Sequence, residues 1–279
     1  MTDGQPEVSG ERQIAVTRLA IAAVKGTRLR SVDRILLGRS GARENRRFYV
    51  IDARDRMRNG KQLGELQAIL ASYSDSARRL ALEFPDGSVV AGDVEPGPAL
   101  STRFFSRPLQ ARLVLGPWSS ALSEHVGQPL RLVEGETGSS VDRGRRGSVS
   151  LISSASLIRL AGAGAQAAVD ARRFRMLIEV DGVGAHAEDA WVGGAAQVGG
   201  ARVAFRGHVG RCLVTSRDPD TGAIDLPTLD ILGGYRRGCD TTEPLAFGVY
   251  GEVLEEGTVA VGDRVLPGLS AAPAKLQRQ

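Results

Sequence analysis

Short runs in which apolar and polar residues alternate recur along the chain, and they constrain its fold more than any other feature. In the first half they occupy residues 47–53, 78–93, 110–116 and 129–135. A period of two is typical of β-strands with one buried face. The 35 glycines and 12 prolines can supply the tight turns between such strands. The segment FPDGS at 84–88 predicts a hairpin. We therefore expect a β-rich α+β fold.

The length of 279 residues exceeds one typical domain and favours two packed units. Residues 117–128, PWSSALSEHVGQ, resemble a short helix at the junction. We expect a first domain at 12–116 and a second at 128–267. Residues 1–11 and 268–279 are expected to be flexible tails.

The second half mixes strand and helix patterns. An arginine- and glycine-rich loop at 142–148 precedes an apolar segment in which Ser153 or Ser154 can cap a helix that ends near Leu160. Strands are expected at 173–182 and in two runs between 199 and 215, followed by a turn at Asp218–Gly222. Residues 226–237 are expected to be helical.

Charge and composition narrow the class of protein. A net charge of +4 is too small and too dispersed to predict nucleic acid as a partner. The polar N-terminal residues and the lack of an apolar run of about 18 residues predict neither export nor a membrane span. Two cysteines cannot form a disulfide framework, so reduced cytoplasm fits best.

Lysine is rare in this chain and therefore informative. Only Lys25, Lys61 and Lys275 occur among 36 basic residues. Lys275 lies in a polar tail, but Lys25 and Lys61 lie in sequence that is expected to be ordered. A compact ammonium at those two positions can matter in a way that arginine does not replace.

The common catalytic motifs are missing. His125, His186 and His208 are far apart in sequence and lack metal-ligand spacing, so surface or core roles are favoured. The sequence has neither GxGxxG between a strand and a helix nor a GxxxxGK[ST] loop. Dinucleotide and nucleoside triphosphate chemistry is therefore disfavoured.

Cys212 is the strongest single candidate for chemistry. It lies in VGRCLVTSRDPDTG, where an apolar, strand-like run leads into a polar turn. Arg211 and Arg217 are expected to favour the thiolate, which is both a nucleophile and a soft metal ligand. A lone strand cysteine is usually a small buried apolar residue, and the neighbouring arginines favour a functional role here. Cys239, in the loop RRGCDTT, is interpreted as incidental.

Three segments in order resemble the MOSC family, named for the C-terminal domain of molybdenum cofactor sulfurase. They are FRMLIEVDGVGAHAEDAW, GRCLVTSRDPDTG and PLAFGVYGEVLEEGTVAVGDRV. Upstream, AVTRLAIAAVKGTRLRSV and RENRRFYVIDARDRMRNGKQ resemble the N-terminal β-barrel domain that precedes MOSC in the mitochondrial amidoxime-reducing component and its bacterial relatives. The resemblance covers about residues 14–266. It implies an N-terminal β-barrel-like domain packed on a MOSC β-barrel domain with a few short helices.

The resemblance also implies a set of site residues. The cysteine of the family's RC motif ligates molybdenum, which points to Cys212 as catalytic residue and metal ligand. The phosphate and two dithiolene sulfurs of a molybdenum-pterin cofactor need cations and backbone donors. By position, the residues implied to bind this cofactor are Lys25, Gly26, Arg46, Lys61, Ser153, Ser154, Arg175, Gly210 and Arg211. The cations Lys25, Arg46 and Arg175 are expected to converge on one pocket between the two domains.

The chain departs from the family pattern at two places. Met176 and Leu177 replace a proline and an asparagine, and Asn45 replaces an aspartate. Loss of the asparagine amide predicts weaker cofactor retention, with partial rescue by Leu177→Asn. Alternatively, Leu177 points into the β-core and the loop Arg143–Ser148 supplies the missing contact.

The resemblance implies a molybdenum oxidoreductase that reduces N-hydroxylated or N-oxide small molecules. Electrons would come from an external donor of ferredoxin or flavin reductase type, because two cysteines cannot hold a four-cysteine iron–sulfur cluster. One alternative is a cofactor carrier or sulfur-transfer protein that carries a persulfide on Cys212. The other is a pathway-specific MOSC-fold enzyme without the metal. Pyridoxal phosphate binding belongs to the family's general description as well.

Overall fold

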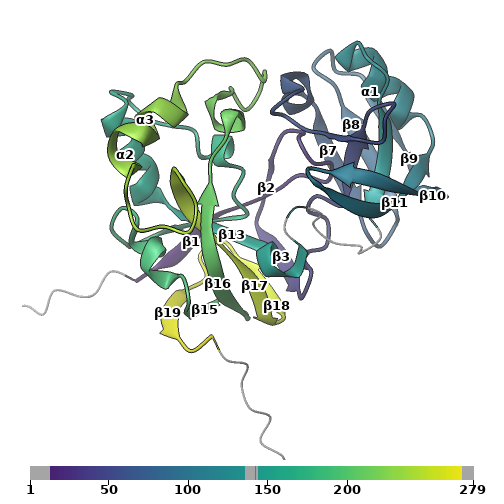
Figure 1. The fold of residues 1–279 in the computed structure, drawn as a ribbon. Coiled ribbons are helices and arrows are strands. Elements are labelled where there is room, and N and C mark those ends of the chain that lie inside the picture. The colour runs from purple at the N-terminus through teal and green to yellow at the C-terminus, as the bar shows by residue number, and fades with distance from the viewer. Residues whose placement is uncertain (1–12, 136–141, 143, 272–279) are drawn as a thin grey trace, which may run out of the picture.

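The computed structural model describes residues 13–135, 142 and 144–271 (Figure 1). The predicted tail at 1–11 and residues 272–279 of the second predicted tail lie outside this part of the chain. Figure 1 shows the helices α2 and α3 beside the strands numbered from β13 upward, while α1 lies with β7 to β11.

The largest sheet combines an early segment with the C-terminal half. Its strands are β1 (Ala15–Ile21), β2 (Arg30–Val32), β13 (Val149–Ser153), β14 (Ile178–Asp181), β15 (Ala195–Val198), β16 (Ala201–Gly210), β17 (Ala246–Glu255) and β19 (Val265–Leu269). Within the described residues their order is β19-β15-β16-β17-β13-β14-β1-β2. A smaller sheet, β18-β3-β4, repeats this pairing of early and late segments with β3 (Arg34–Gly38), β4 (Gly41–Ala42) and β18 (Gly257–Ala260).

Two further sheets are built from residues 48–135. One contains β5 (Phe48–Ile51), β6 (Met57–Arg58), β10 (Glu95–Phe104), β11 (Arg107–Leu115) and β12 (Arg131–Gly135), in the order β10-β11-β12-β5-β6. The other is a meander of β7 (Leu70–Ser74), β8 (Arg79–Glu83) and β9 (Val89–Asp93). The predicted hairpin at 84–88 joins β8 to β9, and Phe84 N–H donates to Ser88 O at 2.9 Å.

The helices are short and occur where the sequence predicts them. In the described part of the chain the α-helices are α1 (Trp118–Val126), α2 (Ser154–Ala163) and α3 (Thr228–Arg236). Ser153 caps α2, because its side chain accepts a hydrogen bond from Ser156 N–H. Single 3-10 turns are η1 (Gly64–Ala68), η2 (Gly144–Gly147), η3 (Ala171–Phe174), η4 (Ala187–Trp191) and η5 (Leu213–Ser216).

The alternating strands bury their apolar faces in two large clusters. Leu19, Leu151 and Phe205 belong to the core of the largest sheet. Phe48 and Trp118 belong to a second cluster, which packs α1 against β5 and the meander. Complete burial of such side chains stabilises a fold by about 1.5–3 kcal/mol each. These two cores fix the segments that carry the candidate site.

The β-rich α+β class is confirmed, but the sheets are open and are not closed barrels. The boundaries at 12–116 and 128–267 stay a prediction. Strands β1 and β3 pair with β14 and β18 of the C-terminal half, and β2 and β4 extend the same two sheets. None of the helices in the described residues is long and apolar enough to cross a membrane.

Candidate cofactor cavity at Cys212

Eight of the residues implied by the resemblance line one cavity of about 260 Å³, here called the Cys212 cavity. They are Lys25, Gly26, Arg46, Lys61, Arg175, Gly210, Arg211 and Cys212. They come from five separate segments of the sequence. The structure therefore brings Lys25, Arg46 and Arg175 together, as the sequence predicts.

The segments that carry Lys25 and Arg46 are held side by side by backbone hydrogen bonds. Lys25 N–H donates to Phe48 O at 2.8 Å, and Arg46 N–H donates to Ala22 O at 2.6 Å. Gly26 has a φ of +100°, and a Cβ there would lie 3.3 Å from Gly60 N. Glycine thus permits a close backbone approach beside the cavity.

Three residues of the cavity adopt a backbone conformation that side chains usually avoid. The φ angles of Arg46, Phe105 and Arg175 are 51°, 55° and 55°. Left-handed conformations of residues other than glycine cost about 1–3 kcal/mol and cluster at functional sites. At these three positions the backbone takes on strain where the side chains line the cavity.

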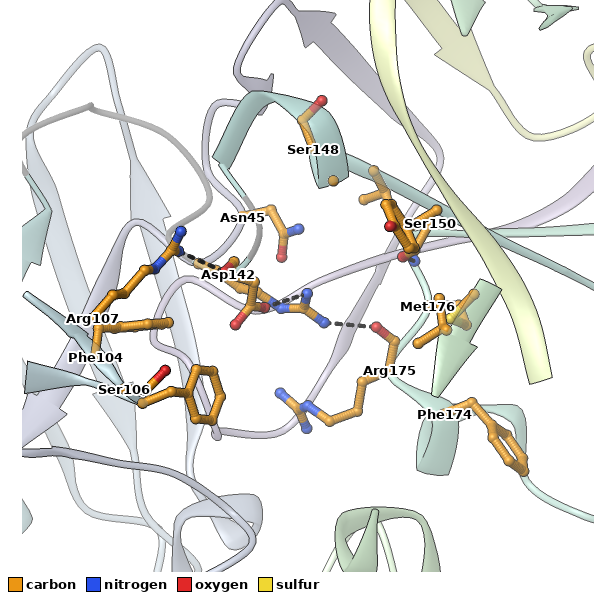
Figure 2. A pocket seen from close by; sticks show the side chains of 16 residues that line it. Asn45, Phe104, Ser106, Arg107, Asp142, Ser148, Ser150, Phe174, Arg175 and Met176 are labelled. Atoms are coloured by element: carbon orange, nitrogen blue, oxygen red, sulfur yellow. Dashed lines mark hydrogen bonds and ion pairs between the residues drawn. The ribbon is translucent and has the colours of Figure 1, made fainter. Parts of the chain in front are cut away.

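Asp142 joins the cations into one network. Its carboxylate forms ion pairs with Lys25 Nζ and with Arg46 Nη1, the latter at 2.6 Å. Arg46 Nη2 also donates to Arg175 O at 2.7 Å. Figure 2 shows Asp142 between Asn45 and Arg175. Three cations and one carboxylate leave this network with a net charge of +2.

The local pKa values follow from this arrangement. Burial alone would raise the pKa of Asp142, but Lys25 and Arg46 outweigh it and hold the pKa well below its usual range. Burial lowers the pKa of Lys25, and Asp142 partly offsets that change. Burial and the neighbouring Arg46 lower the pKa of Arg175 to about 9. Arg175 is therefore still charged at neutral pH, and the network favours an anion.

Cys212 lies just beyond the end of a strand. The expectation that it lies within a strand is wrong, because β16 ends at Gly210 and Cys212 is the N-cap residue of η5. Its side chain is exposed. Cys212 O accepts hydrogen bonds from the Thr215 N–H and hydroxyl, each at 3.0 Å. The thiol is thus accessible on a fixed backbone.

The guanidinium groups on either side of Cys212 bind backbone carbonyls. Arg211 donates to Phe174 O and Phe247 O, each at 2.8 Å. Arg217 donates to Gly222 O at 2.6 Å and to Lys61 O at 3.3 Å. These bonds anchor the Cys212 segment and tie it to the loop that carries Lys61.

The structure does not bring Ser153 and Ser154 to this cavity. Ser153 is fully buried as the N-cap of α2. Ser154 Oγ donates to Glu179 Oε1 and to Val180 O, each at 3.2 Å. The Ser153 hydroxyl therefore caps α2, and the Ser154 hydroxyl ties the first residue of α2 to β14.

A larger cavity of about 460 Å³ adjoins the Cys212 cavity and shares Arg46, Phe105, Phe174 and Arg175 with it (Figure 2). Asn45, Ser148 and Ser150 also line this larger cavity. Ser148 is only 3% exposed, and among the described residues its hydroxyl has no hydrogen-bond partner. Buried hydroxyls are normally paired, so a polar ligand group or a water is expected there.

Met176 and Leu177 are core residues as well as cavity lining. Leu177 is 3% exposed and packs in the core of the largest sheet. Met176 Sδ accepts a contact from Arg211 Nη2 at 3.1 Å. This placement favours the alternative in which Leu177 points into the β-core. Arg143 of the loop in that alternative lies outside the described residues.

Two residues of the site were not identified from the sequence. Asp142 is one acidic residue before a run of arginines, and nothing in that pattern indicates that it bridges Lys25 and Arg46. Phe105 lies at a hairpin tip, where glycine or asparagine is the usual residue. Its aromatic side chain in that turn is the only pattern that could have indicated a role.

Metal binding would depend on one protein ligand. Within residues 13–135, 142 and 144–271, no three His, Cys, Asp or Glu side chains are placed to hold a metal ion together. The donors that are present are an exposed thiol and a cationic network at one cavity. This set fits a metal that is carried by an anionic organic cofactor, with Cys212 as the additional soft ligand.

The fold and the site together define a β-rich protein with a thiol at the edge of a cationic cavity. Residues 138–266 match the model of the MOSC domain family. "Mitochondrial amidoxime-reducing component 1" of Mus musculus is 38% identical over 104 residues, which are 35% of this chain and 30% of that protein. "Mitochondrial amidoxime reducing component 2" of Homo sapiens is 40% identical over 100 residues, which are 33% and 29% of the two chains.

The match covers less than a third of the length of these curated relatives. Among solved structures, the YUAD protein from Bacillus subtilis aligns over 90% of this chain and 94% of its own, with 11% identity and a TM-score of 0.45. YiiM from Geobacillus stearothermophilus aligns over 44% of this chain and 54% of its own, with 17% identity and a TM-score of 0.33.

Proposed function

We propose that this protein is a molybdenum-dependent MOSC oxidoreductase that reduces N-hydroxylated or N-oxide compounds. One observation carries the proposal: an exposed cysteine thiol lines the same cavity as Lys25, Arg46 and Arg175. The names of the matched relatives support the substrate class. The MOSC domain supports a molybdenum-pterin cofactor.

Different residues of the cavity would bind different parts of such a cofactor. Cys212 would supply a thiolate to the metal. Lys25, Arg46 and Arg175 would bind the cofactor phosphate, because a net charge of +2 matches a phosphate monoester dianion. Each charge-assisted hydrogen bond is worth about 1.5–3 kcal/mol. The bound cofactor would supply the two-electron chemistry that releases the substrate oxygen as water.

The electrons are proposed to come from a partner protein of ferredoxin or flavin reductase type. The chain has two cysteines, and an iron–sulfur cluster of the ferredoxin type needs four. Cys212 is exposed, so the cavity edge is open to a small substrate.

The test compares the two cysteines of the chain. Cys212→Ser is expected to lose most of the bound molybdenum and about 100-fold or more of the amidoxime reduction rate, because serine is a poor ligand for this metal. Cys239→Ser, at the second exposed cysteine, is the matched control and should keep both. Molybdenum content by plasma mass spectrometry and thermal unfolding are measured on the same samples. Unchanged molybdenum and activity in Cys212→Ser would refute the proposal.

The accessible thiol also suits a second function, the transfer of sulfur as a Cys212 persulfide. A purified protein that contains persulfide at Cys212 and no molybdenum would favour that function. Cyanide release of thiocyanate from wild type but not from Cys212→Ser distinguishes it from the reductase.

A further inference from the structure

The tip of the β10–β11 hairpin carries an aromatic residue in an unfavourable conformation. Phe105 and Ser106 form the turn, since Phe104 pairs with Arg107. The φ of Phe105 is +55°. Two-residue hairpin turns favour glycine, asparagine or aspartate at such positions. A phenyl ring at this position therefore lowers the stability of the turn.

Burial does not explain this placement. Phe105 is 62% exposed, whereas its neighbour Phe104 is completely buried. An exposed aromatic ring contributes little to the core, so its stabilising effect does not offset the backbone strain. A role in contact with a ligand accounts for both features.

The ring is nevertheless held in place. The Phe104 and Phe105 rings meet edge to face with their centroids 5.2 Å apart. Lys25 Nζ lies 5.6 Å from the Phe105 centroid, within the range of a cation–π contact. A ring that is fixed before binding loses less conformational entropy when a ligand stacks on it.

Phe105 also lies where the two cavities meet, because it lines both of them. In Figure 2 the neighbouring hairpin residues Phe104, Ser106 and Arg107 lie on one side of the larger cavity, with Phe174, Arg175 and Met176 on the other. A small molecule that approaches Cys212 through this opening passes the Phe105 ring.

We propose that Phe105 is a specificity-determining residue whose ring stacks on a planar, conjugated group of the small molecule that enters the Cys212 cavity. This inference rests on the proposed function and names the shape of its substrate.

The experiment measures binding, not turnover. Calorimetric titrations of the purified protein use two probes: benzamidoxime, and acetamidoxime, which lacks the ring. Wild type is expected to bind benzamidoxime about tenfold or more tightly than acetamidoxime. Phe105→Leu is expected to weaken benzamidoxime about five- to tenfold while acetamidoxime changes by less than about twofold.

Phe105→Gly separates recognition from structure. Glycine accepts a φ of +55°, so this variant should lose the preference for benzamidoxime without a lower melting temperature. Ile158→Ala removes another exposed apolar side chain, 72% exposed on α2, and should change neither affinity nor preference.

The inference is overturned if wild type shows no preference for benzamidoxime, or if Phe105→Leu and Phe105→Gly keep it. It is also overturned if both variants weaken the amidoxime probes equally and melt earlier, because Phe105 would then be structural. Molybdenum content, measured on the same samples, reports separately on the proposed function. A ring preference that depends on Phe105 in a protein without molybdenum would refute only the reductase.

Discussion

Two clusters of charged side chains in this protein differ in how completely their charges are matched. In the first, Asp142 pairs with Lys25 and Arg46 beside two cavities, and Arg46 also donates to the carbonyl of the third cation, Arg175. In the second, Arg236 binds Asp189 at 2.6 Å and Ala246 O at 3.0 Å. The first cluster has cations in excess at an opening, and the second pairs one cation with one carboxylate inside the fold.

This difference distinguishes a binding site from a structural contact. Buried charges are costly unless they are paired. The Asp189–Arg236 pair meets that requirement with protein groups, and it ties η4 (Ala187–Trp191) to α3 and β17. The Lys25 cluster retains two uncompensated positive charges, which an anionic ligand can neutralise. The MOSC resemblance singles out both segments, and under the proposed function only the first would receive a ligand.

The largest effect is expected from breaking the matched pair. Arg236→Ala leaves Asp189, whose side chain is 20% exposed, without its cation. The free energy of unfolding should fall by about 3 kcal/mol, as for other partly buried pairs that lose one member. Urea denaturation measures this loss. Arg237→Ala, at the exposed neighbour, should change stability by less than about 0.5 kcal/mol. Equal effects of the two substitutions would show that the pair is not structural.

A smaller effect is expected from Asp142→Asn. Asp142 is as buried as Asp189, so the substitution is costly, but the adjoining cavity can admit water to the three cations. About 2 kcal/mol of stability should be lost at neutral pH. The folded-state pKa of Asp142 is depressed, so its contribution is present above about pH 4 and disappears as the pH falls further. The difference from wild type should shrink accordingly in urea denaturation at low pH.

The binding of inorganic phosphate tests whether the Lys25 cluster has an excess of positive charge. With Asn at position 142 the cluster carries a net charge of +3, so phosphate should raise the melting temperature more in Asp142→Asn than in wild type. Asp181→Asn, at an exposed carboxylate on β14, is the control. A larger phosphate effect in the control than in Asp142→Asn would contradict the assignment of an anion site.

Much of the fold was predictable because local patterns and tertiary structure agree. The alternation at 78–93 with its FPDGS turn became β8 and β9, and Ser153 caps α2 as its position before an apolar helix indicates. The open sheets were not predictable in this way. The pairing of β1 with β14, more than 150 residues away, depends on long-range packing that no local period encodes.

The candidate site also has features that the sequence could indicate and features that depend on the folded geometry. The resemblance identified Cys212 and the three cations because their residue types and spacing are distinctive. It could not show that Asp142 already binds two of those cations, since contacts between side chains depend on the folded geometry. The apolar run across Arg211 made Cys212 resemble a strand residue, whereas the strand ends at Gly210. The alternation of apolar residues does not locate the end of a strand to within two residues.

The most direct measurement of the central claim is X-ray absorption at the molybdenum edge of the purified protein. The account predicts a sulfur shell with about three sulfurs in wild type: two from the dithiolene and one from Cys212. Cys239→Ser should keep that shell, and any molybdenum left in Cys212→Ser should show one sulfur fewer. A wild-type protein without molybdenum, or an identical sulfur shell in Cys212→Ser, would contradict the account.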